Sequence, residues 1–295
     1  MHKFLRAIGF SQLNKRKDLQ KLITDIIVEA PIRSYTSVED NNILASFSKE
    51  VAPGIGICVV GEFDEEDQFS YDYFYPYAEG DCISTEEDVS VERHIATESY
   101  AGVFEDARMG ISVIFYLQNL IPYVKALRSD MLPLTGTTLS LSALSTDGII
   151  LMPLQKTAKD MIAHSAASVN RAKLVMAARR GDEDAMENLT LNDMDTYTTI
   201  AQKIKQDDIF TLVDTYLMPY GVECDQYSIL GEIVEVENVE NELTHEEMYF
   251  MQITCNDIQF RLCVNKDDVY GEPAAGRRYK GNIWLQGKIN FPNQN

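Results

Sequence analysis

The last apolar segment of the chain constrains the fold more than any other. Residues 278–291 (RYKGNIWLQGKINF) alternate between two kinds of side chain over their whole length. Successive side chains of a β-strand point to opposite sides. One side of this segment carries Tyr279, Ile283, Leu285, Ile289 and Phe291. The other side carries Arg278, Lys280, Trp284 and Lys288. The alternation predicts a strand with one face in a hydrophobic core and one basic, aromatic face.

This basic face stands out because the chain as a whole is acidic. The 295 residues have a net charge of −20 and a pI of about 4.5. Such a charge opposes non-specific binding to nucleic acid or to an anionic membrane. A tryptophan flanked by cations suits stacking on a base or docking on an acidic protein surface. We therefore expect a binding surface at Arg261, Arg278, Lys280, Trp284 and Lys288. The alternative is that Trp284 is buried at a seam within the chain.

The periodicity of apolar residues divides the chain into segments. Apolar residues recur at helical spacing in the first 31 residues, and the period changes to two from about residue 42 to 154. A second helical pattern follows to about residue 218, with helices that open on aspartates such as Asp182 and Asp207. After Asp225 the period returns to two. Asp147-Gly148 and Asn256-Asp257 both indicate tight hairpin turns.

These patterns predict an α+β fold with a mostly antiparallel sheet. We expect an α+β domain at 1–155, a helical segment at 156–222 that packs on it, and a small β module at 223–295. Glycines at Gly231, Gly281 and Gly287 permit the bends of a small barrel of the oligonucleotide-binding type. A plain meander packed on the helices is the alternative.

A row of tyrosines forms the second candidate site. In residues 69–77 every second residue is aromatic, and the row includes Tyr71, Tyr73, Tyr75 and Tyr77. Aromatic rings aligned on one face can stack a sugar or a base. The alternative is that they pack against helices. Pro76 predicts an edge strand, because proline cannot donate to a β-ladder.

Catalytic and metal-binding motifs are missing from the sequence. The four histidines show no spacing typical of zinc sites or nucleophile triads, and the acidic residues 62–67 do not match a calcium loop. Five scattered cysteines without a CxxC pair are typical of reduced thiols in the cytoplasm. The N-terminus lacks the pattern of a signal peptide, and no apolar run reaches the length of a membrane span. We predict no catalytic residues, no metal and no cofactor.

Three stretches resemble a known family: MHKFLRAIGF at the start, AARRGDEDAMENL at 177–189 and MPYGVECDQYSILGEI at 218–233. The chain is similar to an uncharacterised family of full-length proteins, a domain of unknown function found mostly in gut Clostridia. The resemblance covers nearly the whole chain. It implies a bacterial cytosolic setting and no particular activity.

The sequence favours a soluble, cytoplasmic binding or adaptor protein without catalytic activity. Its basic Trp284 face would contact a protein or a second copy of the chain, with a small anionic ligand as a further candidate and no membrane partner. One alternative is a carboxylate- or metal-dependent hydrolase with a cleft between sheet and helices. The other is single-stranded nucleic-acid binding by the C-terminal module, which the net acidity disfavours.

Overall fold

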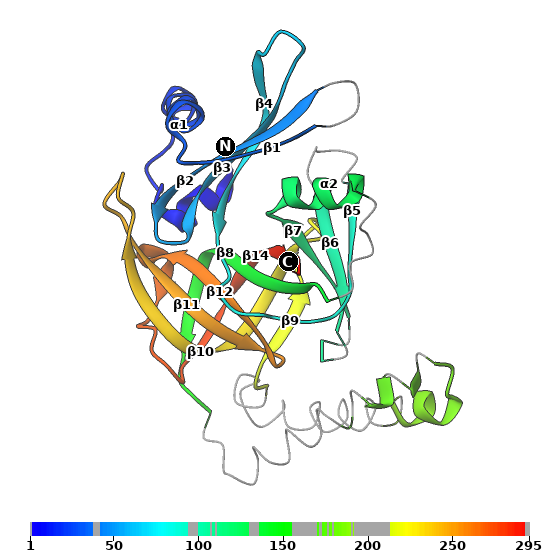
Figure 1. Cartoon of the computed structure of the whole chain (residues 1–295). Coiled ribbons are helices and arrows are strands. Elements are labelled where there is room, and N and C mark those ends of the chain that lie inside the picture. The colour runs from blue at the N-terminus through cyan, green and yellow to red at the C-terminus, as the bar shows by residue number, and fades with distance from the viewer. Residues whose placement is uncertain are drawn as a thin grey trace.

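The structure is a computed structural model that describes residues 2–37, 42–93, 100–106, 108–109, 111–129, 136–154, 170, 173–175, 177–178, 180–189, 191 and 213–292. This part of the chain forms two β-sheets with a few short helices (Figure 1). The predicted α+β class is confirmed. None of the helices in the described ranges is long and apolar enough to cross a membrane.

The N-terminal sheet has four antiparallel strands in chain order. They are β1 (Ile32–Ser37), β2 (Ile43–Ala52), β3 (Ile55–Phe63) and β4 (Phe69–Ala78). The helix α1 (Arg16–Glu29) packs on β2 and β3, and α2 (Leu120–Arg128) packs on β1 and β2. Within this sheet β4 pairs only with β3, so it is the edge strand that Pro76 predicts.

The second sheet closes into a five-stranded barrel. Its strands are β8 (Thr138–Leu151), β10 (Gln226–Glu240), β11 (Glu247–Cys255), β12 (Ile258–Asn265) and β14 (Arg278–Asn290). Around the barrel the order is β8, β12, β11, β10 and β14, and β14 pairs with β8 to close the ring. The pair of β8 and β12 is parallel, and the other pairs are antiparallel.

The topology of this barrel is a permuted form of the oligonucleotide-binding barrel. If β8 is moved from the start of the strand sequence to its end, the strand order and directions become those of that fold. The long β10 pairs with β14 through its first half and with β11 through its second. Gly231 lies where the pairing changes, and a Cβ there would lie 2.4 Å from Cγ2 of Ile253. Only glycine fits this bend, as predicted.

One strand of the barrel, β8, comes before the helical segment in the chain, which the sequence did not indicate. The hairpin predicted at Asp147-Gly148 is wrong, because β8 continues through it as one strand with a bulge opposite Asn282. The hairpin at Asn256-Asp257 is confirmed, and both residues have positive φ values of 49° and 62°.

Shorter strands extend the second sheet beyond the barrel. They are β5 (Val89–Arg93), β6 (Tyr100–Glu105), β7 (Ser112–Leu117), β9 (Tyr216–Pro219) and β13 (Val269–Tyr270), with a short 3-10 helix η3 (Lys266–Asp268) before β13. The helix expected up to Met218 is wrong at its end, because residues 216–219 form β9. Most of the helical segment expected at 156–222 lies outside the described residues. Within it, Asp182 caps the turn that follows by accepting a hydrogen bond from the Ala185 amide.

The core has two parts that share the strand β14. Its apolar side, with Tyr279, Ile283, Leu285 and Ile289, fills the barrel interior, which confirms the predicted dry face. Its opposite side packs toward the N-terminal sheet, together with a 3-10 helix η1 (Lys3–Ile8). Buried Gln286 joins the two sheets, because its amide accepts from the Ala78 amide at 3.3 Å and donates to the Pro76 carbonyl at 2.9 Å.

Candidate functional site: an aromatic groove beside Trp284

The predicted basic surface is largely occupied by the chain itself. Arg278 is 5% exposed and donates to the carbonyls of Met152 and Val213. Arg261 is also buried, and its guanidinium bonds to Asp81 and Glu237 and lies 4.8 Å from the Phe250 ring centroid.

The two lysines of this surface are more accessible than the arginines. Lys280 and Lys288 are half-buried, and the Lys288 ammonium lies 3.8 Å from the Glu79 carboxylate. Lys288 and Glu79 also line a smaller pocket of about 200 Å³ between the N-terminal sheet and α2. The structure therefore does not bring the predicted cations together on one exposed face.

Trp284 lies at a seam between the barrel, η1 and β7. Only 5% of it is exposed, and its ring centroid lies 4.8 Å from His2, 5.3 Å from Phe4 and 5.0 Å from Tyr116. The indole Nε1 donates a 2.7 Å hydrogen bond to the Asp225 carboxylate. This burial corresponds to the seam alternative of the sequence analysis.

The tyrosine row on β4 runs from the surface into the core. Tyr71 is 45% exposed, Tyr73 is half-buried, and Tyr75 and Tyr77 are buried. The rings of Tyr73 and Tyr75 stack at 6.4 Å, and Tyr75 lies 4.8 Å from Tyr116. The inner part of the row therefore reaches the same aromatic cluster as Trp284.

Members of both predicted sites line one groove. This groove has a volume of about 630 Å³ and is bordered by η1, β4, Tyr116, Trp284 and the segment 220–226. Tyr73, Tyr75 and Trp284 line it, whereas Tyr71, Tyr77 and the predicted cations do not. We call it the aromatic groove. Tyr220 and Val222 form an apolar lip at its edge and are 48% and 98% exposed.

Sequence reasoning missed several residues of the groove. His2, Lys3 and Phe4 come from the N-terminal stretch, and Asp225 and Gln226 from the junction before the barrel. Two of the three stretches that carry the family resemblance, 1–10 and 218–233, supply these residues. That coincidence was a signal for the site, although only the fold shows that the two stretches meet.

The ionisable groups of the groove include one neutral histidine. Burial, together with the nearby positive charges of the N-terminus and Lys3, lowers the pKa of His2 to about 4, so the ring is uncharged at neutral pH. The buried Nδ1 of His2 has no hydrogen-bond partner among the described residues. Burial also raises the pKa values of Tyr73 and Tyr116, so both hydroxyls stay protonated. Lys3, Glu223 and Asp225 remain as charged side chains of the lining.

Two observations bear on metal chemistry and on the buried thiols in the described part of the chain. No three His, Cys, Asp or Glu side chains there are grouped so that they could hold a metal ion. Cys58, Cys255 and Cys263 are buried, and burial raises the pKa of each thiol, that of Cys255 to about 12. A thiol with a raised pKa is a poor nucleophile at neutral pH.

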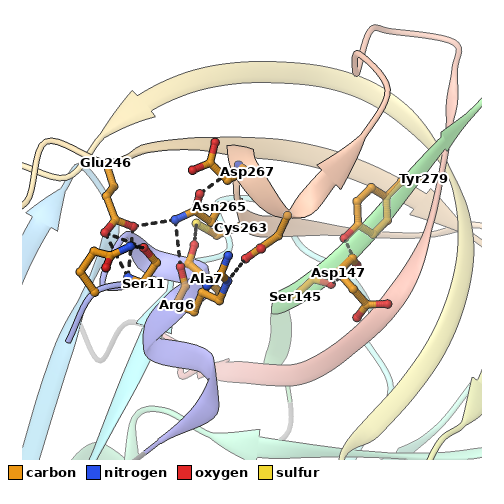
Figure 2. A network of polar contacts seen from close by, with 12 residues as sticks. Arg6, Ala7, Ser11, Ser145, Asp147, Glu246, Cys263, Asn265, Asp267 and Tyr279 are labelled. Atoms are coloured by element: carbon orange, nitrogen blue, oxygen red, sulfur yellow. Dashed lines mark hydrogen bonds and ion pairs between the residues drawn. The ribbon is translucent and has the colours of Figure 1, made fainter. Parts of the chain in front are cut away.

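The surface where oligonucleotide-binding barrels take their ligands is covered in part by η1, which packs on β12 and bonds to Asn241. In such barrels the site is the outer face of the second and third strands with the loop between the first two, which here are β11, β12 and residues 241–246. Figure 2 shows the polar contacts on this face. Cys263 donates to the carbonyl of Ala7, and Glu246 accepts from both Ser11 and Asn265.

Residues 5–287 match the family described as "Domain of unknown function, E. rectale Gene description (DUF3881)". The chain belongs to this family. The match covers nearly the full length, which confirms the resemblance seen in the sequence. No curated protein and no solved structure matches the chain. The DUF3881 description carries no activity, so a functional proposal has to rest on the aromatic groove itself.

Proposed function

We propose that this DUF3881 protein is a non-catalytic binding protein and that its ligand site is the aromatic groove. One observation carries the proposal: side chains from both predicted binding sites, Trp284 and the inner tyrosines of β4, line a single open groove. Ligand sites are typically concave, mostly apolar and furnished with a few polar groups. The groove has this character, because aromatic rings form its walls and Asp225, Gln226 and Lys3 supply polar groups.

The proposal modifies the expected role of Trp284. The indole serves as a wall of the site, because its buried ring is held by Asp225 and by the rings of Phe4 and Tyr116. A rigid wall of this kind reduces the entropy lost on binding. The proposed setting is the cytoplasm, since the cysteines of the described residues are free thiols.

The two alternative functions have less support. A hydrolase would need convergent carboxylates, and the described residues offer no cluster suited to a metal ion. Nucleic-acid binding by the barrel would need the outer face of β11 and β12, and η1 packs on the β12 part of it. The net charge of −20 also opposes binding of a polyanion.

A ligand screen tests the proposed function. Trp284 is the only tryptophan and lines the groove, so a ligand bound there should change the intrinsic fluorescence and raise the melting temperature. Tyr73→Ala should weaken such a ligand at least tenfold, because it removes a wall of the groove.

Tyr71→Ala is the matched control, since Tyr71 lies two residues away on the same strand and outside the groove lining. It should leave the affinity unchanged. A ligand that stabilises the protein equally in the wild type and in Tyr73→Ala binds elsewhere and contradicts the proposal.

A further inference from the structure

We infer that the ligand of the aromatic groove is a small organic cation that carries an ammonium group. This inference rests on the proposed function and specifies its ligand class. It follows from three features of the lining: the aromatic walls, the carboxylates next to them, and an ammonium that the chain itself already holds at the edge.

The first feature is the density of aromatic faces. Rings of Phe4, Tyr73, Phe74, Tyr116, Tyr220 and Trp284 all contribute to the lining. The negative face of an aromatic ring attracts a cation, and sites that recognise quaternary ammonium groups are built from several such rings. The tyrosine hydroxyls keep their protons here, since burial raises the pKa values of Tyr73 and Tyr116. The rings therefore act as neutral π-systems.

The second feature is negative charge beside these rings. Asp225 and Glu223 both belong to the lining, and Trp284 Nε1 fixes the Asp225 carboxylate at 2.7 Å. Burial is the main cause of the raised pKa of Tyr116, and the negative charge of Asp225 raises it further. The Asp225 carboxylate therefore interacts electrostatically with this aromatic wall. His2 contributes no positive charge at neutral pH. The positive charges near this end of the groove are those of Lys3 and the N-terminus, which both act on His2. The Asp225 carboxylate, held against the Trp284 ring, gives the aromatic wall itself a negative partner for a cation.

The third feature is Lys3, whose ammonium is an internal example of the proposed recognition. Its Nζ lies 4.8 Å from the centroid of the Phe4 ring and donates a 2.7 Å hydrogen bond to Gln226 Oε1. The edge of the groove therefore binds an ammonium with an aromatic face and a side-chain oxygen. Trp284 and Asp225 in the same lining offer the same two kinds of group, an aromatic ring and a side-chain oxygen, with negative charge on the oxygen atoms. A small anion would instead meet Asp225 and Glu223, which repel it.

Choline and its uncharged carbon isostere, 3,3-dimethyl-1-butanol, form the test. The two have the same shape and differ in the charge of one atom. Calorimetry and Trp284 fluorescence should detect saturable binding of choline, and binding of the alcohol at least tenfold weaker. The difference corresponds to about 1.4 kcal/mol, within the range of cation–π pairs reinforced by a carboxylate. A higher salt concentration should lower the affinity for choline and leave the affinity for the alcohol unchanged.

Two substitutions locate the charge that matters. Asp225→Asn keeps an oxygen acceptor for Trp284 and removes the charge, and Glu223→Gln removes the second charge at a more exposed position. Each should reduce the affinity for choline severalfold, and together at least tenfold. Glu235→Gln, on the exposed side of β10 outside the groove, is the matched control and should change nothing.

The outcomes separate this inference from the proposed function. Equal affinities for choline and the alcohol, or unchanged choline binding in both carboxylate variants, would overturn the inference. The inference would also be overturned if choline failed to bind and a neutral or anionic ligand bound in a way that requires Tyr73. The groove would then remain a binding site. Absence of any ligand dependent on Tyr73 would overturn both.

Discussion

The outer face of β12 and the aromatic groove are both bordered by η1, yet η1 covers the first and leaves the second open. On the covered face, polar side chains of the barrel bind the backbone of the N-terminal segment. Asn241 donates to the Ile8 carbonyl at 2.7 Å, and Thr244 donates to the Gly9 carbonyl at 2.6 Å. On the groove side, the same segment presents the side chains of His2, Lys3 and Phe4. The backbone of η1 makes the polar contacts on the covered face, most of its side chains are buried in the core, and Lys3 and Phe4 also line the groove.

The contrast explains why the barrel topology alone is a poor guide to function here. A fold that commonly binds ligands on one face has that face occupied by its own chain. The open volume lies where the barrel, β4 and η1 meet, outside the usual site of such barrels. Substitutions in η1 and at its partners can show whether the cover is a fixed part of the core and whether the groove depends on it.

The largest effect is expected from Ile8→Ala. Ile8 is fully buried in the cluster between the barrel and the N-terminal sheet. The substitution leaves a cavity and should lower the free energy of unfolding by about 2–5 kcal/mol. Urea denaturation measures the change. Val28→Ala, at an apolar position 66% exposed on α1, should change it by less than about 0.5 kcal/mol. A loss under 1 kcal/mol for Ile8→Ala would mean that η1 is a loosely held cover.

A second effect concerns pH and the groove side of η1. His2 has a pKa of about 4 in the folded chain, below its ordinary value of 6.5, because burial disfavours the charged ring. The unfolded chain then binds more protons between these values, so stability is complete above pH 6.5 and falls as the pH drops toward 4. The loss should reach about 3 kcal/mol.

Fluorescence of Trp284, whose ring lies 4.8 Å from that of His2, reports the change locally. His2→Phe keeps a ring in place and removes the titration, so its stability should vary less with pH over this range. Identical pH profiles for the two proteins would show that His2 does not govern the packing of η1 against Trp284.

A third effect tests the hydrogen bonds of the covered face. Asn241 is fully buried, and its side chain also accepts hydrogen bonds from the amides of Leu243 and Thr244. Asn241→Ala leaves these groups and the Ile8 carbonyl without partners and should cost about 1–3 kcal/mol. Hydrogen exchange of the η1 amides should accelerate by a corresponding factor. Unchanged hydrogen exchange would mean that apolar packing alone holds η1 on the barrel.

Local patterns of the sequence predicted local features of this structure well. The two faces of β14 follow from a period of two, and the turn at Asn256-Asp257 follows from residues that accept positive φ. The Asp147-Gly148 pair has the same turn chemistry but lies within β8. There the Tyr279 hydroxyl donates to the Asp147 carbonyl, and the ring packs over Gly148. A contact 132 residues distant along the chain overrides the local preference.

The candidate site was predicted in part for the same reason. Trp284 and the tyrosines were identified by residue type and alternation, but the partners that bury Trp284 come from η1, β7 and the segment before β10. No local pattern contains those pairings. The sequence pattern predicts one surface for the basic residues, whereas Arg261 and Arg278 bond to acceptors of the surrounding chain. Burial of a side chain depends on which distant segments pack against it. Local sequence patterns do not show which segments come into contact.

The smallest effect is expected at the rim of the covered face. Arg6 Nε lies 2.5 Å from the Asp268 carboxylate, and the Arg6 side chain is 44% exposed. Exposed ion pairs contribute about 0–1 kcal/mol, so Arg6→Ala should lower the free energy of unfolding by no more than that, and by less at high salt. Lys49→Ala, which removes the exposed pair with Glu29 on the N-terminal sheet, is the matched control and should behave alike. A loss above 2 kcal/mol for Arg6→Ala alone would mean that charge, rather than buried backbone contacts, holds η1 over β12. High salt could then release η1 from the covered face. The difference between this face and the aromatic groove would then depend on the ionic strength rather than on the fold.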